Sequence, residues 1–317
     1  MVVRRWVAAR WRHSYALAAT YAVLGASTTA LDAQSPRYDS TIVSVAGSGP
    51  MTFVLVTGVV GGVAGFRRLG GVLAQTSRVI TIDPYRLALD SADVTFAALA
   101  RNVDVVLGEY GVDSARVVGH AHGAGVALRL AANSPNRVAA LYFLDVGALA
   151  ENRTKLLSSS LKLAPLIARL PGGKGFVRGR YVKGLRQNAA SDAWLDSTTV
   201  RGYTEPFLTN LSKVVAMAGR LSRAREPESR EALVARLGVP VTVLLGAVPH
   251  PAGPDSAELE VLAPLGSRLR IERLEGAGHF PHEEATAKVA EFLLAAMPRV
   301  SFRGRPGRVT SSLGTAP

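Results

Sequence analysis

The chain has 317 residues and no cysteine. Disulfides, thiolate metal sites and a cysteine nucleophile are therefore excluded. Aromatic residues are also scarce, at 6%. They do not alternate with basic residues in the way that is typical of nucleic-acid binding. The hydrophobic content of 48% is nevertheless high enough for a large buried core, so the composition predicts a folded domain stabilised by apolar packing.

Acidic residues are few in three segments, so the net charge of +13 is unevenly distributed. Residues 1–33 carry +3, residues 151–230 carry +9 and residues 298–317 carry +4, which leaves −3 for the remainder. A basic excess of this kind can attract acidic surfaces. No nucleic-acid recognition motif accompanies it, so we predict no nucleic-acid partner and a mostly solvated basic face.

Residues 1–33 have the organisation of a secretory signal peptide. Four arginines precede an apolar stretch from Tyr15 to Ala26, and small residues around Ala33 offer a cleavage site. The apolar stretch is shorter than the roughly 20 residues that span a bilayer. We therefore predict export to the periplasm or the exterior, with no stable transmembrane span after cleavage. An uncleaved N-terminal membrane anchor is the alternative, and the Arg4-Arg5 pair allows a twin-arginine route.

Short, uniformly apolar runs rich in β-branched residues follow the signal segment. Such runs are typical of strands that are buried on both faces of a parallel sheet. Helical patterns separate them, as where Phe96, Leu99, Val103 and Leu107 share one helix face. The alternation predicts the α/β class with a doubly wound, mostly parallel sheet. The predicted strands are residues 52–57, 78–83, 116–119, 139–145 and 239–245.

The alternation of strands and helices stops between residues 147 and 228. Helical patches flank a Gly- and Arg-rich centre there. We interpret residues 147–228 as a helical lid inserted into an α/β core that comprises residues 34–146 and 229–298. Residues 299–317 are rich in Arg, Gly, Ser and Pro, which predicts a disordered basic tail.

A serine is missing where the surrounding pattern requires one. Residues 119–123 read Gly-His-Ala-His-Gly, which has the form of a nucleophile elbow, Gly-x-Ser-x-Gly, with Ala121 at its centre. An elbow is a sharp turn between a buried strand and a helix, and it presents its central side chain at the edge of the sheet. Alanine has no nucleophilic atom. We expect the side chains of His120 and His122 to point away from the site, so neither replaces the missing group.

Four further motifs accompany the elbow at 119–123 in order along the chain. They are Gly47–Pro50 before the first central strand, Thr57–Gly62, Asp83–Arg86, and the loop Gly276–Glu283 that contains a histidine. With these five motifs the chain resembles the α/β-hydrolase family over residues 40–297, where Thr57–Gly62 takes the place of His-Gly-x-x-Gly, Asp83–Arg86 that of Asp-x-x-Gly, and Gly276–Glu283 that of the late histidine loop. The resemblance implies the fold of that family, a helical lid and descent from serine hydrolases. It implies no cofactor, and the sequence has no metal cluster, phosphate loop or dinucleotide fingerprint.

The resemblance assigns a base and an acid to the site. His279 takes the place of the base. The usual acid would follow the strand at 239–245, but Pro249 stands there. Asp145, at the end of the strand 139–145, is the better candidate, because haloalkane dehalogenases place their acid at that strand end. The alternative is that Asp145 only caps the edge of the strand. We expect Asp255 to be a helix N-cap.

The resemblance also assigns an oxyanion hole to the backbone amides of Val59 and His122, which do not depend on side-chain identity. Other family positions differ in this chain. Thr57 stands where the family has histidine, and Leu87 where it has glycine. Several parts of a hydrolytic site have therefore changed together.

Three functions remain open at this point. In the first, the chain binds a small, partly apolar ligand under the lid without hydrolysing esters, with Trp194, Tyr203 and Phe207 in the pocket. In the second, a His279–Asp145 base pair acts without a covalent nucleophile, as in hydroxynitrile lyases and cofactor-free dioxygenases. In the third, a secreted interaction protein contacts acidic partners through its basic lid. The oligomeric state is not predicted by the sequence.

Overall fold

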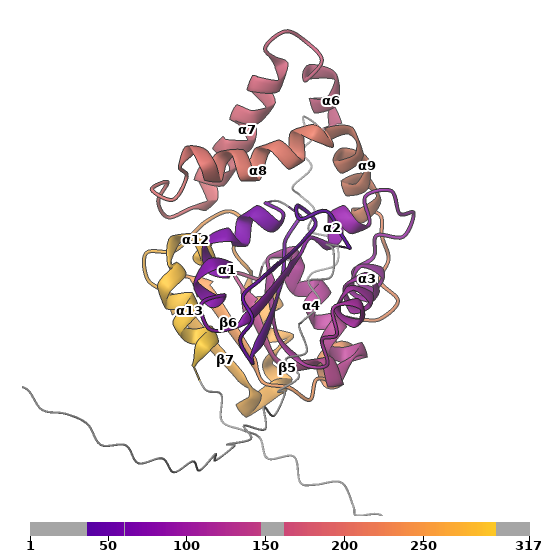
Figure 1. Cartoon of the computed structure of the whole chain (residues 1–317), viewed down its shortest axis with the longest axis vertical. Helices are drawn as coiled ribbons and strands as arrows, with labels where there is room; N and C mark the ends of the chain where they lie inside the picture. Colours follow the sequence, from indigo (N-terminus) through magenta and orange to yellow (C-terminus); the bar gives the residue numbers. More distant parts are fainter. Residues whose placement is uncertain (1–36, 60, 147–161, 296–317) are drawn as a thin grey trace, which may run out of the picture. The chain divides into compact units, whose positions relative to one another are not determined.

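A seven-stranded sheet forms the centre of the molecule (Figure 1). A computed structural model describes residues 37–59, 61–146 and 162–295. The described residues from Tyr38 onward belong to one unit. The predicted signal peptide, the first part of the predicted lid and the predicted basic tail lie outside the described residues. Within the described ranges, no helix combines the length and apolarity needed to cross a membrane.

The sheet is parallel except at one edge. Its spatial order is β1-β3-β2-β4-β5-β6-β7, and only β1 runs antiparallel, against β3. The predicted strands correspond to β2 through β6, which are almost entirely buried. The two edge strands were not predicted, because their partly exposed residues break the uniform apolar run. The strands are β1 (Val43–Ala46), β2 (Thr52–Val56), β3 (Arg78–Ile82), β4 (Ala115–His120), β5 (Val138–Leu144), β6 (Val241–Gly246) and β7 (Leu269–Leu274).

Helices cover both faces of the sheet, which confirms the predicted fold class. On one face α3 (Phe96–Glu109), α4 (His122–Asn133) and α10 (Arg230–Ala235) bury apolar side chains against it. On the other face α1 (Arg67–Leu73) and α13 (Thr286–Leu294) do the same (Figure 1). The predicted cap is confirmed, because Asp255 accepts a hydrogen bond from the Glu258 amide at the start of α11 (Ser256–Glu260). Short helical turns complete the core: η1 (Val63–Phe66), α2 (Pro84–Leu87), η2 (Pro135–Arg137), η3 (Ala263–Arg268) and α12 (Pro281–Glu284).

Between β5 and α10, the described residues form four helices that gather at one end of the sheet (Figure 1). We call them the helical insert: α6 (Ala164–Ile167), α7 (Gly173–Asn188), α8 (Ser197–Thr209) and α9 (Leu211–Leu221). The Gly-rich stretch around residue 172 lies between α6 and α7, but it is not a break along its whole length, because a helix begins within it. This helix, α7, begins after a left-handed Gly172 (φ 73°) and continues for 16 residues.

A buried ion pair fixes the segment between α9 and α10 to the core. The Glu226 carboxylate lies 2.9 Å from Arg129 Nε, and both side chains are almost fully buried. Glu226 also accepts hydrogen bonds from the amides of Phe96 and Ala97 at the N-terminus of α3. A carboxylate is stabilised at this end of a helix, because the first amides have no partner within the helix.

Candidate functional site

The strand order changes direction beside β2, and the site lies there. The chain passes from β2 to β3 on one side, whereas β4 pairs with the other side of β2. The loops that follow β2 and β4 therefore diverge and leave a crevice at the carboxyl ends of the strands, which is where open α/β sheets bind ligands. Gly58 and Val59 follow β2, and Ala121 follows β4.

Ala121 is the apex of a strained turn between β4 and α4. Its φ of 48° and ψ of −119° are unusual for a residue with a Cβ atom. The Ala121 amide donates to the Leu144 carbonyl (3.1 Å), and the Ala121 carbonyl accepts from the Ala124 amide (3.0 Å). A Cβ atom on Gly123 would lie 2.4 Å from the Val56 carbonyl oxygen, so glycine is required for this close approach. The turn has the sharp form expected of an elbow, with a methyl group at its apex.

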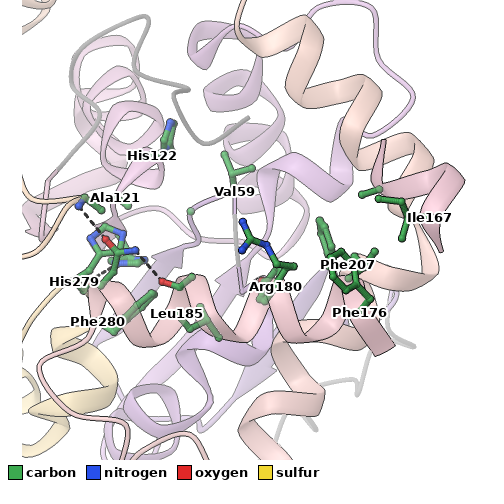
Figure 2. A pocket seen from close by; sticks show the side chains of 18 of the residues that line it. Val59, Ala121, His122, Ile167, Phe176, Arg180, Leu185, Phe207, His279 and Phe280 are labelled. Atoms are coloured by element: carbon green, nitrogen blue, oxygen red, sulfur yellow. Dashed lines mark hydrogen bonds between the residues drawn. The ribbon is translucent and has the colours of Figure 1, made fainter. Parts of the chain in front are cut away.

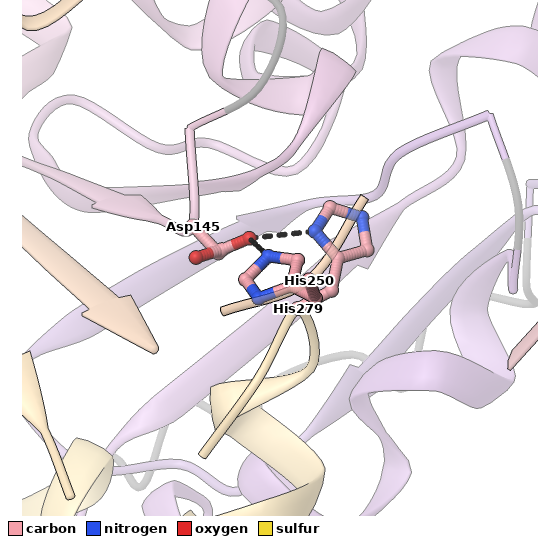
Figure 3. Close-up of side chains that lie close together, drawn as sticks. All are labelled: Asp145, His250 and His279. Carbon is pink, nitrogen blue, oxygen red and sulfur yellow. Dashed lines mark hydrogen bonds and ion pairs between the residues drawn. The ribbon is translucent and has the colours of Figure 1, made fainter. Parts of the chain in front are cut away.

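Asp145, directly after β5, bonds to two histidines through one carboxylate oxygen (Figure 3). Asp145 Oδ2 lies 2.6 Å from His279 Nδ1 and 2.8 Å from His250 Nε2. Its other oxygen, Oδ1, accepts from the Gly246 amide (3.2 Å), and the side chain is fully buried. The structure therefore brings the predicted residues Asp145 and His279 together. It adds His250, which the sequence analysis missed although it directly follows Pro249, at the position of the usual acid.

Asp145 is held as a carboxylate. Burial alone would raise the pKa of Asp145, but the hydrogen bonds and charges of His250 and His279 outweigh burial and hold it well below its ordinary value. An ionised acid at this position accepts the Nδ1 proton of His279 and fixes the tautomer of that ring. The remaining nitrogen of His279, Nε2, has no hydrogen-bond partner among the described residues.

The loop that carries His279 is fixed from two sides. The His279 amide donates to the Asn188 carbonyl at the end of α7 (2.8 Å). The His279 carbonyl lies 2.8 Å from His120 Nε2. The helical insert and β4 thus both position the loop, so the orientation of the His279 ring depends on the insert as well as on the core.

The expectation for His120 and His122 was wrong, since both line the cavity beside Ala121. The His120 ring points toward His279 because its Nε2 bonds the His279 carbonyl, and the two ring centroids lie 4.8 Å apart. Burial, reinforced by the nearby His279, lowers the pKa of His120 to about 3 and that of His122 to about 4. Both rings are therefore neutral near physiological pH.

A cavity of about 640 Å³ lies between this edge of the sheet and the helical insert. Ala121, His279 and Phe280 form one end, and Phe176 and Phe207 from the insert form the other (Figure 2). Its volume lies in the range of roughly 300–1,000 Å³ that is typical of small-molecule sites. Its walls are mostly apolar, with a few polar groups from His120, His122, Arg180, Tyr181, Asn188 and His279.

The three aromatic residues predicted to line a pocket separate into two groups. Phe207 lines the cavity and packs on Tyr181, with ring centroids 4.8 Å apart. Trp194 and Tyr203 do not line it. They are buried behind Phe280, and Tyr203 packs against Gly61 while its hydroxyl donates to Glu283. Aromatic character indicated burial correctly but not which side of the cavity wall each ring would occupy.

The two residues predicted to supply the oxyanion donors lie at the same cavity as Ala121. Val59 and His122 both line the cavity. His122 is the first residue of α4, so its amide has no partner within the helix. No described residue accepts a hydrogen bond from either amide. Their role as oxyanion donors stays a prediction.

Asp145, His250 and His279 also offer ligand atoms that lie within 4.8 Å of one another, as a metal site would require. Ligands of a zinc ion surround a common centre at roughly 2.0–2.2 Å from the metal. Here Asp145 Oδ2 contacts both rings directly, at 2.6 and 2.8 Å. The geometry is that of a carboxylate that accepts from two ring N–H groups, so we do not assign these residues as metal ligands.

Solved structures with the same fold cover most of this chain. An alpha/beta hydrolase fold protein from Burkholderia ambifaria is 21% identical, with a TM-score of 0.63, over 80% of this chain and 92% of its own. A thermophilic esterase from Thermogutta terrifontis is 20% identical, with a TM-score of 0.59, over 79% and 90%. A candidate epoxide hydrolase from Pseudomonas aeruginosa is 25% identical, with a TM-score of 0.57, over 80% and 89%.

The sequence model of the alpha/beta hydrolase family matches residues 53–292, which is most of the chain. The match begins in β2 and ends within α13, so it includes the strained turn at Ala121, the carboxylate of Asp145 and the loop of His279. The arrangement of these parts on a mostly parallel sheet agrees with that match. The chain belongs to the alpha/beta hydrolase family.

Proposed function

We propose that this protein binds a small, mostly apolar molecule in the cavity between Ala121 and the helical insert, without forming a covalent intermediate. The observation that carries this proposal is the cavity itself, because Ala121 and His279 form one end of it. A covalent mechanism needs a nucleophilic atom at the apex of the turn, and a methyl group cannot supply one. In this proposal Ala121 stands in place of an ancestral serine and the insert acts as a lid.

A second function, proton transfer by His279, is favoured by one distance. The 2.6 Å contact between His279 Nδ1 and Asp145 leaves the His279 Nε2 lone pair as the proton acceptor. The amides of Val59 and His122 would stabilise negative charge that develops on a ligand oxygen. A ligand with an acidic C–H or O–H group would then be deprotonated without a covalent step.

Binding through the basic insert alone has less support. That function is expected to leave no room for a small ligand, whereas the cavity is within the range of small-molecule sites. The similar proteins named as an esterase and a candidate epoxide hydrolase suggest hydrolysis. We do not transfer that activity, because of Ala121. Export through the predicted signal peptide remains part of the proposal.

The cavity can be tested with two glycines of α7. A Cβ atom on Gly184 or on Gly179 meets no atom within 4 Å, so both positions accept a larger side chain. Gly184 lines the cavity and Gly179 does not. We expect Gly184→Leu to weaken the binding of a neutral apolar dye, 1-aminoanthracene, at least about tenfold, because the side chain occupies ligand volume. Gly179→Leu should bind the dye as the parent does, and equal affinity in both variants would contradict the proposal.

Ester cleavage provides the complementary assay. The parent chain and a His279→Ala variant should release p-nitrophenol from short acyl esters at the same rate, since neither has a nucleophile. A parent rate clearly above that of the variant would show hydrolysis that depends on His279 and would contradict the absence of ester turnover. The dye titration and the ester assay therefore test the two halves of the proposal separately.

A further inference from the structure

His250 is held rigidly although it lies in a loop. It stands between Pro249 and Pro251 after β6, and proline restricts its own backbone and that of the preceding residue. The Val248 amide donates to the Ala277 carbonyl (3.0 Å), and the Ala252 amide donates to Asn188 Oδ1 (3.0 Å). Its side chain is only 4% exposed. The ring is therefore fixed next to Asp145 by the chain on both sides of it.

Both nitrogens of the His250 ring face groups that can only accept hydrogen bonds. Nε2 lies 2.8 Å from the Asp145 carboxylate, and Nδ1 lies 2.9 Å from the Val248 carbonyl oxygen. A neutral imidazole carries one N–H group, so it would direct a bare lone pair at one of these oxygens. Two acceptors at hydrogen-bond distance require two protons. The geometry is that of an imidazolium cation.

The charged groups around His250 favour the same protonation state. Burial lowers the pKa of His250, but the hydrogen bond and charge of Asp145, the Val248 carbonyl and the charge of Glu284 in α12 raise it overall above its ordinary value. The His279 ring is the other titratable group that faces it, with its centroid 5.5 Å away. Among the described residues no carboxylate forms a hydrogen bond with His120 or His122, and burial lowers the pKa of both rings.

We propose that His250 is a positioning residue: a buried imidazolium that holds Asp145 ionised, so that His279 keeps its Nδ1 proton on Asp145 and its Nε2 toward the cavity. The two rings share Oδ2, so a proton on the carboxylate would displace one of them. His250 does not line the cavity, and in this proposal it acts only through Asp145. The proposal rests on the proposed function only in the role given to His279.

The protonation state can be measured on the full chain with ¹⁵N-labelled histidine by NMR. Near pH 7, His250 should show protons on both ring nitrogens, while His120 and His122 should show one N–H each. The His250→Gln variant assigns the His250 signals by their loss. A single N–H on His250 near pH 7 would overturn the proposal. This readout needs no ligand, so it stands whether or not the cavity binds the dye.

The pH dependence of thermal stability gives a second readout. A histidine with a raised pKa in the folded state stabilises the fold fully below its unfolded value, 6.5, and loses that contribution as the pH rises through the folded value. The Tm of the parent should therefore decrease more than the Tm of His250→Gln between pH 6.5 and about 9. Gln still donates to Asp145 but carries no charge. Identical Tm profiles over this range would overturn the proposal.

The His122→Gln variant is the matched control for the Tm measurement. His122 has a lowered pKa, so its effect on stability is confined to pH values below 6.5, where only the unfolded state gains the proton. The variant should keep the parent's slope above pH 6.5. A slope that changes in His122→Gln as much as in His250→Gln would show that the effect is not specific to Asp145, and would count against the proposal.

Discussion

The turns after β4 and β5 each hold a residue with positive φ, but the two residues carry different side chains. Ala121 and Asp145 both have positive φ, at 48° and 45°, and they are the non-glycine residues with this property in the described ranges. Each amide donates to the next strand, Ala121 to the Leu144 carbonyl and Asp145 to the Leu244 carbonyl. Asp145 then forms three further hydrogen bonds through its carboxylate, whereas Ala121 presents a methyl group. A strained turn therefore persists at Ala121 without a reactive side chain.

The largest effect is expected at the turn after β5, where Asp145 carries a carboxylate. Asp145→Asn retains the shape of the side chain, and asparagine tolerates positive φ. It removes the charge that pairs with the buried His250, so we expect a loss of about 3–5 kcal/mol in the free energy of unfolding. Urea denaturation measures this loss. A loss below about 1 kcal/mol, in the range of exposed ion pairs, would mean that Asp145 is not paired as described.

At the turn after β4, a substitution of Ala121 should have a smaller effect of the opposite sign on the free energy of unfolding. Ala121→Gly relieves backbone strain of about 1–3 kcal/mol but adds about 0.5–1 kcal/mol of chain entropy to the unfolded state. The net stabilisation should be about 1 kcal/mol by urea denaturation. Ala124→Gly makes the same change at a buried helical position of α4 and should destabilise the fold by a similar amount. Equal signs for the two variants would show that the turn at Ala121 is not strained.

Sequence patterns predicted most of the core because burial on both faces leaves a uniform apolar run. The runs at 52–57 and 239–245 became β2 and β6 for that reason. β7 was missed because only Leu274 in it is fully buried. The centre of the insert was also misread, since α7 begins at the glycines that looked like a break and has exposed residues over most of its length.

The sequence predicted only those site residues that follow a predicted strand or lie in a recognisable loop. Asp145 follows a predicted strand and His279 follows a recognisable loop, so their meeting at one edge of the sheet could be expected. His250 lies 105 residues from Asp145 in sequence, and the contact depends on the path of a loop after β6. No local periodicity encodes such a path. The positions of Trp194 and Tyr203 depend in the same way on how α8 packs against η1.

The reactivity of Ala121→Ser tests most directly whether a base is still directed at the apex of the turn. The new hydroxyl would stand beside His279 and the amides of Val59 and His122. We predict that this variant reacts with a fluorophosphonate probe at least about 100-fold faster than the parent, because a positioned base activates a serine. Adding His279→Ala should abolish the gain. A folded Ala121→Ser variant that stays unlabelled would contradict the claim that Asp145 and His279 remain assembled for proton transfer at this turn.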